Sequence, residues 1–222
     1  ISLCIHFMAG SYGWYHRYEI YILAFVLVVT LYICSATITN FIERNSTHLA
    51  RIIILAACST VFIGSPYISG LFTVPLASNN IYEQQYQMHR FVVEYYNQPV
   101  AVNDLGYVSY KNENYVLDLW GLGSKKAFEY RTRGNDKDWM KKLCEDSHIG
   151  LVFIYDEWFT DIPNDWIKLG ELRLSKTRIT PAGSEVAFYA TSKEAFSDIA
   201  LKLDEFIKTL PSGVEFVYET NR

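Results

Sequence analysis

The sequence predicts transmembrane α-helices followed by a soluble α/β domain with a mostly parallel sheet and an antiparallel edge. The first observation is the distribution of charge: of 20 basic and 24 acidic residues, residues 1–80 hold only Arg17, Arg44, Arg51, Glu19 and Glu43. The second is that short apolar runs alternate with amphipathic segments beyond residue 99, which is typical of strands and helices. We therefore divide the chain into a membrane region, residues 1–80, and an extracytoplasmic α/β domain, residues 81–222.

Two long uncharged runs predict the membrane spans. Residues 20–42 carry no charged side chain, and at a helical rise of about 1.5 Å per residue they reach ~35 Å, past a hydrocarbon core of ~30 Å. Residues 52–82 are also uncharged but are interrupted by glycine and proline, so we place the second span near residues 50–72. A pair of buried core helices is the alternative, although such helices seldom run this far without charge. Residues 1–9 are apolar and too short to span, which predicts the end of an earlier membrane helix.

Basic residues set the expected orientation. The loop between the spans carries Arg44 and Arg51, whereas residues 10–19 carry Arg17 alone. Cytoplasmic loops are enriched in Lys and Arg, so we expect the middle loop inside and residues 81–222 outside, in the periplasm or an equivalent compartment. Residues 81–222 show no basic stripe, which argues against a nucleic-acid partner.

The downstream elements follow from periodicity. Tyr82, Tyr86, His89, Val93 and Tyr96 recur at intervals of four and three, which predicts an amphipathic helix with an aromatic stripe leading out of the membrane. Buried strands are expected at residues 100–102, 115–119 and 150–155. A helix over residues 135–147, capped by Asn135 or Asp136, separates the last two strands, and this order implies parallel pairing. Residues 166–174 and 185–190 read as an antiparallel addition.

The last helix has the clearest sequence signal. Thr191 and Glu194 stand at capping-box spacing. They precede an apolar stripe, whose members are Phe196, Ile199, Ala200, Leu203, Phe206, Ile207 and Leu210. Residues 211–213 end the helix, and residues 214–218 read as a final strand.

Three carboxylates follow predicted parallel strands and are the candidate ligand residues of the soluble domain. These are Asp104, Asp118 and Asp156. Ligands of open α/β sheets bind beyond the carboxyl ends of the strands, so the three acids could share a rim and hold a sugar or a divalent cation. The alternative is that each acid caps a helix or closes a turn.

Other motifs favour structural roles. Residues 121–125 read Gly-Leu-Gly-Ser-Lys, which lacks the spacing of a phosphate-binding loop and favours a turn with Ser124 as a helix cap. His89 and His148 have no nucleophile close in sequence, and no cysteine and histidine pairing indicates a metal site. We therefore expect neither a hydrolase triad nor a zinc centre.

An aromatic and charged segment stands just before the first span. Arg17, Tyr18 and Glu19 lie at the expected outer surface. Aromatic residues and a cation there can simply anchor the helix at the headgroup layer. Alternatively, the Arg17 guanidinium could bind a lipid-linked phosphate bidentately, with Tyr18 or Glu19 fixing its orientation.

Three short segments of the sequence resemble a known protein family. Residues 16–21 (His-Arg-Tyr-Glu-Ile-Tyr), 103–107 (Asn-Asp-Leu-Gly-Tyr) and 116–122 (Val-Leu-Asp-Leu-Trp-Gly-Leu) resemble the C-terminal part of bacterial multi-spanning GT-C type glycosyltransferases, related to protein O-mannosyltransferases and lipid A aminoarabinose transferases. The resemblance spans roughly residues 12–125. It implies an integral protein of the bacterial inner membrane that transfers a sugar from a polyprenyl-phosphate carrier to a glycan, lipid or protein acceptor at the outer membrane face.

The resemblance also limits what this chain can contribute. In that family the catalytic acid lies in the first extracytoplasmic loop near the amino terminus, so no residue here is credited as the catalytic base. It makes Arg17 the candidate for the carrier phosphate and leaves Asp104 and Asp118 as motif residues. A membrane-anchored binding or scaffolding module without catalysis is the alternative function.

Overall fold

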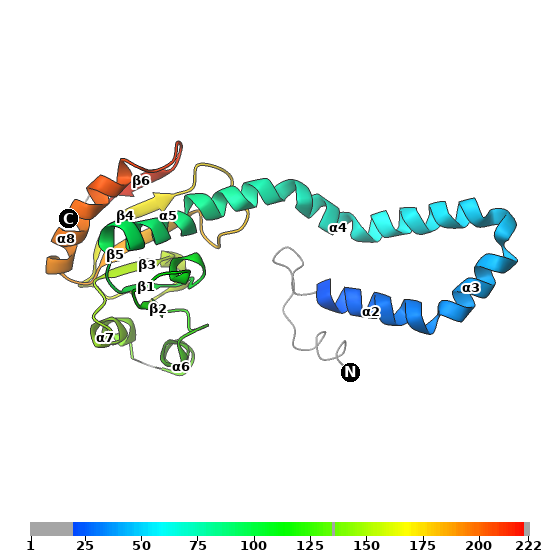
Figure 1. The fold of residues 1–222 in the computed structure, drawn as a ribbon. Coiled ribbons are helices and arrows are strands. Elements are labelled where there is room, and N and C mark those ends of the chain that lie inside the picture. Colours follow the sequence, from blue (N-terminus) through cyan, green and yellow to red (C-terminus); the bar gives the residue numbers. More distant parts are fainter. Residues whose placement is uncertain (1–19, 135, 220–222) are drawn as a thin grey trace. The chain divides into compact units, whose positions relative to one another are not determined.

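The computed structural model describes residues 20–134 and 136–219. It has N-terminal helices followed by an α/β domain with a six-stranded mixed sheet (Figure 1). The chain divides into two compact units, one ending at Val74 and the other beginning at Pro75, somewhat before the predicted boundary at residue 80.

The first unit is helical. Its elements are α2 (Ile20–Ile33), α3 (Ser35–Arg44), the 3-10 turn η1 (Ser46–His48) and the larger part of α4 (Leu49–Glu83). The expected single helix over residues 20–42 is interrupted because Cys34 has a ψ of 2°, far from the helical value of about −42°, which redirects the helix axis. Helix α4 runs on past residue 72, where we placed the end of the second span.

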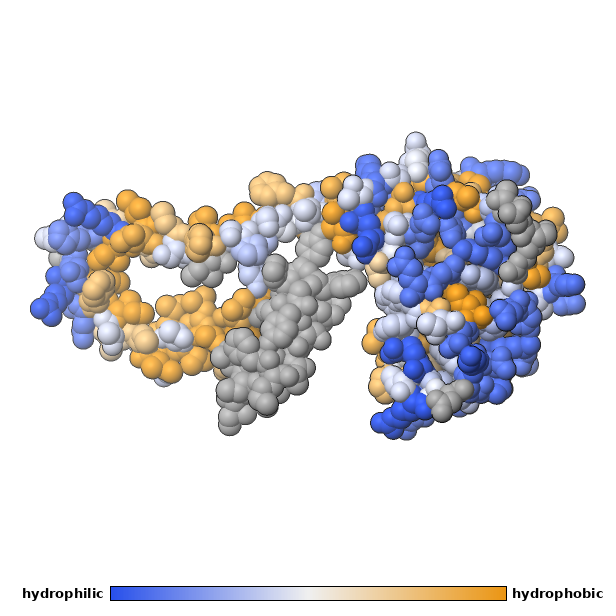
Figure 2. All heavy atoms as spheres, turned by 180° about the vertical axis from the view of Figure 1, so that it is seen from behind, coloured by the Kyte–Doolittle hydropathy of each residue, from blue (hydrophilic) through white to orange (hydrophobic). Residues whose placement is uncertain are grey.

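Among the described residues, no single helix combines the length and the apolar character of a membrane span. Two bent helix pairs meet the requirement together, by length and composition: Ile20–Ile33 with Ser35–Arg44, bent by 63°, and Ala50–Phe62 with Gly64–Tyr96, bent by 55°. Apolar side chains cover these helices (orange in Figure 2). Among them Tyr32, Phe62 and Phe72 are 81%, 80% and 80% exposed.

The second unit is a three-layer α/β domain. Its strands are β1 (Val100–Val102), β2 (Val116–Asp118), β3 (Leu151–Ile154), β4 (Ile167–Arg173), β5 (Glu185–Ala190) and β6 (Glu215–Tyr218), in the spatial order β2-β1-β3-β5-β4-β6. Strands β1, β2 and β3 are parallel, as predicted, but β2 and β3 do not pair with each other, because β1 lies between them and pairs with both. Strands β5, β4 and β6 continue the sheet in antiparallel pairing, so the sheet is mixed rather than mostly parallel.

Alternating side chains build a core on each face of the sheet. Leu151 and Phe153 of β3 face one hydrophobic cluster, while Val152 and Ile154 face the other, as the two-residue period of a strand requires. The first cluster is covered by α5 (Gln85–Arg90), the π-helical segment η2 (Phe91–Tyr96) and α8 (Lys193–Ile207). The second is covered by α6 (Lys125–Arg133) and α7 (Trp139–Asp146). Cys144 is buried in the second cluster, and burial raises the pKa of its thiol to about 12.

Three local predictions are corrected by the structure. Ser192 caps α8 by accepting from the Ala195 N–H at 3.2 Å, because Thr191 instead donates to the Ile149 carbonyl at 2.8 Å. Helix α7 begins at Trp139 rather than at residue 135. The carboxylate of Asp136 binds the backbone N–H of Asp138 instead of capping a longer helix.

The aromatic stripe of residues 82–96 is not the main buried face of its helix. Phe91 and Val92 are fully buried, whereas Tyr82 is exposed. The buried positions before the π-helical segment, Gln84, Gln87 and Met88, already lie on an adjacent face of the helix. Of the five stripe residues only Tyr96 is buried, and it follows the i to i+5 turn, which advances the helix by one extra residue. Asn97 ends this segment with a left-handed φ of 58° and donates its N–H to the Val92 carbonyl.

Candidate functional site

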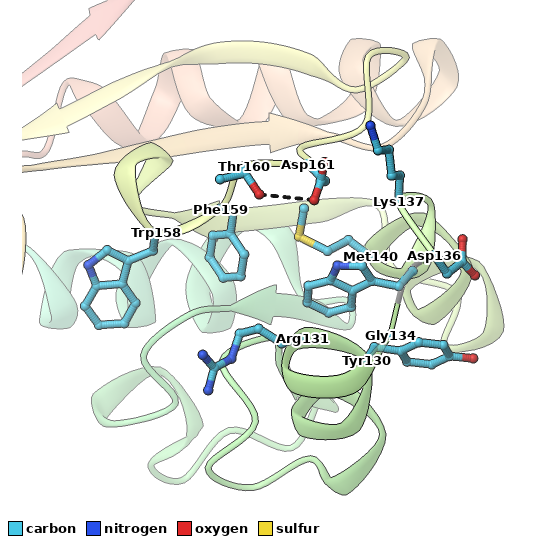
Figure 3. A pocket seen from close by; sticks show the side chains of 11 residues that line it. Tyr130, Arg131, Gly134, Asp136, Lys137, Met140, Trp158, Phe159, Thr160 and Asp161 are labelled. Atoms are coloured by element: carbon cyan, nitrogen blue, oxygen red, sulfur yellow. Dashed lines mark hydrogen bonds between the residues drawn. The ribbon is translucent and has the colours of Figure 1, made fainter.

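A cavity of about 420 Å³ lies against the second face of the sheet, between the end of α6, the start of α7 and the segment after β3 (Figure 3). Its size falls within the range of about 300 to 1,000 Å³ typical of ligand sites. The lining residues include four aromatic side chains, Tyr130, Trp139, Trp158 and Phe159. The polar ones include Arg131, Asp136, Lys137, Thr160 and Asp161.

The aromatic wall is continued by Trp120, which stands behind Trp158. Their ring centroids are 4.4 Å apart. Phe159 contacts Trp139 at 6.3 Å, and Tyr130 stacks on Trp139 at 6.4 Å with an interplanar angle of 15°. These are the offset and tilted geometries that aromatic pairs favour, so the cavity has a stable aromatic wall.

Asp118 fixes the position of Trp120. Its carboxylate accepts the backbone N–H groups of Trp120 at 2.8 Å, Gly121 at 3.0 Å and Gly123 at 2.5 Å. The turn also requires glycine at position 121, where φ is 90° and an added Cβ would lie 2.6 Å from the backbone of Phe128. Ser124 then caps α6, as predicted, by accepting from the Ala127 N–H.

Arg131 brings a positive charge to the aromatic wall. Its guanidinium carbon lies 3.9 Å from the centroid of the Trp120 ring, and its Nε donates to the Trp120 carbonyl at 2.9 Å. Such a cation over an indole is attracted by the ring electrons. Within residues 20–134 and 136–219 the ion pairs found do not include Arg131, so its charge is not neutralised by a neighbouring carboxylate.

The two aspartates that line the cavity, Asp136 and Asp161, have different hydrogen-bond partners. Asp136 pairs with Lys142 at 2.5 Å, and this hydrogen bond lowers the pKa of the Asp136 carboxyl. Asp161 accepts from the Thr160 hydroxyl at 3.1 Å, the hydrogen bond drawn as a dashed line in Figure 3. The cavity thus combines apolar ring faces with charged and hydroxyl groups around them.

The three candidate carboxylates follow the ends of the parallel strands, but each has different hydrogen-bond or charge partners. Asp118 binds the turn that carries Trp120. Asp156 accepts from Lys168 Nζ at 2.7 Å and from the Tyr189 hydroxyl at 3.1 Å. Asp104 lies two residues beyond β1, close enough to Tyr155 to contribute to the raised pKa of that phenol, whose main cause is burial. In the part of the chain that the structure describes, no cluster of three His, Cys, Asp or Glu side chains suited to a metal ion is found.

Asp156 borders a second, smaller cavity of about 120 Å³ with Glu157, Glu171 and Glu185. Burial would raise the pKa of Glu171, but hydrogen bonds from Lys168 and Arg173 outweigh it and lower that pKa to about 2. The hydrogen bond with Glu171 raises the pKa of Glu185. This group is a compact ion-pair network that ties β4 to β5 and to the end of β3.

The remaining candidates are placed as follows. Arg17, Tyr18 and Glu19 lie outside the described residues, so the carrier-phosphate hypothesis stays a prediction. His89 lies on a helix face and His148 at the end of α7, with a left-handed φ of 53°.

Sequence reasoning missed the residues of the aromatic cavity. Arg131 and Trp158, which line it, and Trp120, which contacts both, come from three separate segments, and only their assembly on one face of the sheet reveals them. One signal was present in the sequence: Trp120 and Trp158 each follow shortly after the end of a predicted strand, where ligands of α/β sheets gather.

The comparisons with known proteins give one match. Residues 79–189 match the model of a domain of unknown function, DUF8728. Neither the curated proteins nor the solved structures contain a significant match.

Proposed function

The chain belongs to the DUF8728 family, and we propose that it is the C-terminal portion of an integral-membrane glycosyltransferase whose α/β domain binds saccharide in the aromatic cavity. The sugar would come from a polyprenyl-phosphate carrier, and the acceptor would be a glycan, lipid or protein at the outer membrane face. The single observation that carries this proposal is the cavity itself, with Trp158, Phe159 and Trp139 beside Arg131 and Asp161.

The chemistry of this cavity suits a sugar. The C–H faces of a pyranose pack on aromatic rings, whereas its hydroxyl groups need charged or polar partners around the ring edge. Arg131 supplies donors and Asp161 supplies acceptors at opposite sides of the cavity. A site built in this way binds a polyol through a few directed hydrogen bonds and an apolar stacking surface.

The position of the cavity supports a role close to a membrane-bound substrate. It opens where the segments after β2 and β3 gather, at the carboxyl edge of the parallel strands. The same edge meets the last turns of α4 and the first of α5, since the Tyr155 hydroxyl donates to Gln84 Oε1 at 2.6 Å. The cavity and the Gln84 contact therefore lie at the same edge of the sheet, on its two faces.

The exposed side chains of residues 20–74 support a membrane location. Large apolar side chains covering helices in this way are unfavourable in water, and a lipid environment would bury them. With the middle loop inside, as Arg44 and Arg51 favour, the α/β domain lies outside. Arg17, with Tyr18 or Glu19, would then contact the carrier phosphate at that face.

A membrane-anchored saccharide-binding module without catalysis is the second candidate. It is favoured by the carboxylates of this domain, because Asp118 and Asp156 are held by backbone N–H groups and by Lys168 respectively. These are roles in structure rather than in proton transfer.

Binding and turnover separate the two candidates. Saccharide binding to the chain in lipid nanodiscs is measured by tryptophan fluorescence, with Trp158→Ala and Arg131→Gln as test variants and Tyr115→Ala, an exposed ring outside the cavity, as control. We expect each test variant to weaken binding by about tenfold or more, as loss of a ring contact or a charged donor does.

Turnover is measured with radiolabelled polyprenyl-phosphate sugar on the longest natural form of the protein, with Arg17→Ala beside the cavity variants. Loss of transfer in the cavity variants supports the glycosyltransferase. Binding without any transfer by the unaltered protein favours the binding module. Unchanged binding in both test variants contradicts the saccharide site itself.

A further inference from the structure

Five rings form a cluster on the surface of the α/β domain next to the end of α4. We call it the tyrosine surface, and its residues are Tyr82, Tyr86, His89, Tyr107 and Tyr110. Tyr82 stacks on Tyr86 at 5.3 Å, and Tyr107 meets both Tyr86 and His89 edge to face at 5.6 and 5.4 Å. Although the rings are packed together, Tyr82, Tyr107 and Tyr110 remain 47%, 37% and 56% exposed.

A charged group borders this cluster. Lys111, whose φ of 48° places it at a tight turn, holds its Nζ 5.4 Å from the centroid of the Tyr110 ring. Glu113 is the acid nearest in sequence. The surface is therefore amphipathic, with exposed phenols and a lysine beside one carboxylate.

A second surface lies beside the same helix. Residues 175–180, which we call the basic loop, include exposed Lys176 and Arg178 and no acidic residue. Figure 1 shows the connection between β4 and β5 beside the last turns of α4.

The basic loop is held to the helix by buried polar side chains. Asn80 Oδ1 accepts from the Ile179 N–H at 2.7 Å, and Glu83 accepts from the N–H and hydroxyl of Ser175 at 2.9 and 2.5 Å. Gln84 Nε2 donates to the Gly183 carbonyl, just beyond the loop, at 3.2 Å, and the Thr180 hydroxyl donates to the Ala77 carbonyl at 3.1 Å. The loop is thus fixed to residues 77–83, at the end of the uncharged stretch of the chain.

We propose that the tyrosine surface and the basic loop rest on the headgroup layer of a phospholipid bilayer, with Lys176 and Arg178 binding anionic headgroups. The inference rests on the membrane location in the proposed function and adds the surface on which the domain sits. Tyrosine is enriched at membrane interfaces because its ring is apolar and its hydroxyl is hydrated. Lysine and arginine next to a span attract anionic lipid.

The position of these groups along the helix fits the end of the uncharged run. Residues 52–82 carry no charge, and the basic loop is bonded to the helix between Ala77 and Glu83. Lys176, Arg178 and Tyr82 therefore lie where lipid tails would give way to headgroups, a layer about 5 to 8 Å thick on each side of the hydrocarbon core.

The test uses fluorescence quenching in nanodiscs. A bimane label is attached to Ser109→Cys or Thr177→Cys in a chain whose Cys4, Cys34 and Cys58 are changed to serine, since Cys144 is buried. Ser197→Cys on α8 is the matched control, because Ser197 is exposed and α8 begins next to Gly150, at the opposite edge of the parallel strands. Lipid carrying a nitroxide on its headgroup is the quencher.

We expect clear quenching at positions 109 and 177 and little at position 197. Lys176→Gln with Arg178→Gln should reduce the quenching at position 177 in nanodiscs that contain anionic lipid. Equal quenching at all three positions, or none at 109 and 177, overturns the inference.

A label on the native Cys58, with nitroxide on the lipid acyl chain, reports insertion separately. If Cys58 is quenched while positions 109 and 177 are not, the membrane location stands and only this inference fails. The tyrosine surface would then be expected to bind a protein partner instead of lipid. If Cys58 is not quenched, the membrane location and the inference fail together.

Discussion

Replacing Asp118 tests whether one buried carboxylate supports the aromatic wall of the cavity. The side chain is 3% exposed and accepts three backbone N–H groups within the turn that carries Trp120. A hydrogen bond to a charged group contributes about 1.5 to 3 kcal/mol. The full sum will not be lost in Asp118→Ala, because Gly121 and Gly123 are not buried and water can reach their N–H groups. We therefore expect a loss of about 3 kcal/mol, with about half of that for Asp118→Asn, which keeps one acceptor oxygen.

The assay is thermal unfolding of the chain in nanodiscs, followed by tryptophan fluorescence. For a domain of this size 1 kcal/mol corresponds to about 2 to 4 °C in Tm, so Asp118→Ala should lower Tm by roughly 6 to 12 °C. Because Trp120 loses its fixed position behind Trp158, saccharide binding should weaken as well. Asp138→Asn is the control, since Asp138 is exposed and makes no capping hydrogen bond from its side chain. An Asp118→Ala variant that unfolds within about 1 °C of the unaltered protein would refute the role assigned to this carboxylate.

Three further predictions concern the stability of the domain. Glu83→Gln leaves the N–H and the hydroxyl of Ser175 with a weaker acceptor, so amide hydrogen exchange in residues 175–180 should be faster than in the unaltered protein, while exchange in α8 stays unchanged. If the variant changes exchange equally in residues 175–180 and in α8, or in neither, this prediction is wrong. The pKa of Glu171 is about 2 in the folded protein against an ordinary value of 4.5, so its contribution is complete above about pH 5 and is lost as the pH falls through about 2. Glu171→Gln should therefore flatten the fall in Tm between about pH 5 and pH 2, and an unaltered fall argues against the ion-pair network. Ser192→Ala should cost about 1 kcal/mol of unfolding free energy by calorimetry and Ser192→Gly only a few tenths, and equal costs would speak against the observed cap.

The strands could be predicted because their signals are local. Val100–Val102 and Leu151–Ile154 are short apolar runs buried on both faces, and the helices between the strands dictate parallel pairing. The capping of α8 was misassigned by one residue, because Thr191 and Ser192 are equally suited to cap and only the distant Ile149 carbonyl decides between them. The extent of the antiparallel pairing was underestimated, because nothing local shows that β5 inserts between β3 and β4.

The candidate site was harder to predict than the fold. Asp118 was identified at the right edge of the sheet, but its role depends on the turn that its carboxylate holds. Trp120 contacts Arg131 of α6 and Trp158 of the segment after β3, so this group joins segments that are distant in the sequence. Likewise, packing against the sheet decides which face of residues 82–96 is buried, and no residue marks the π-helical turn at residues 91–96 in advance.

The polar contact between the end of α4 and the basic loop bears on how the protein is assembled. Asn80, Glu83 and Gln84 form this contact through hydrogen bonds to residues 175–183. Before the contact forms, these side chains and the backbone groups that they bind are therefore hydrated, and no apolar surface is exposed by them. The contact can therefore form after the sheet has folded without an apolar patch being exposed in the meantime.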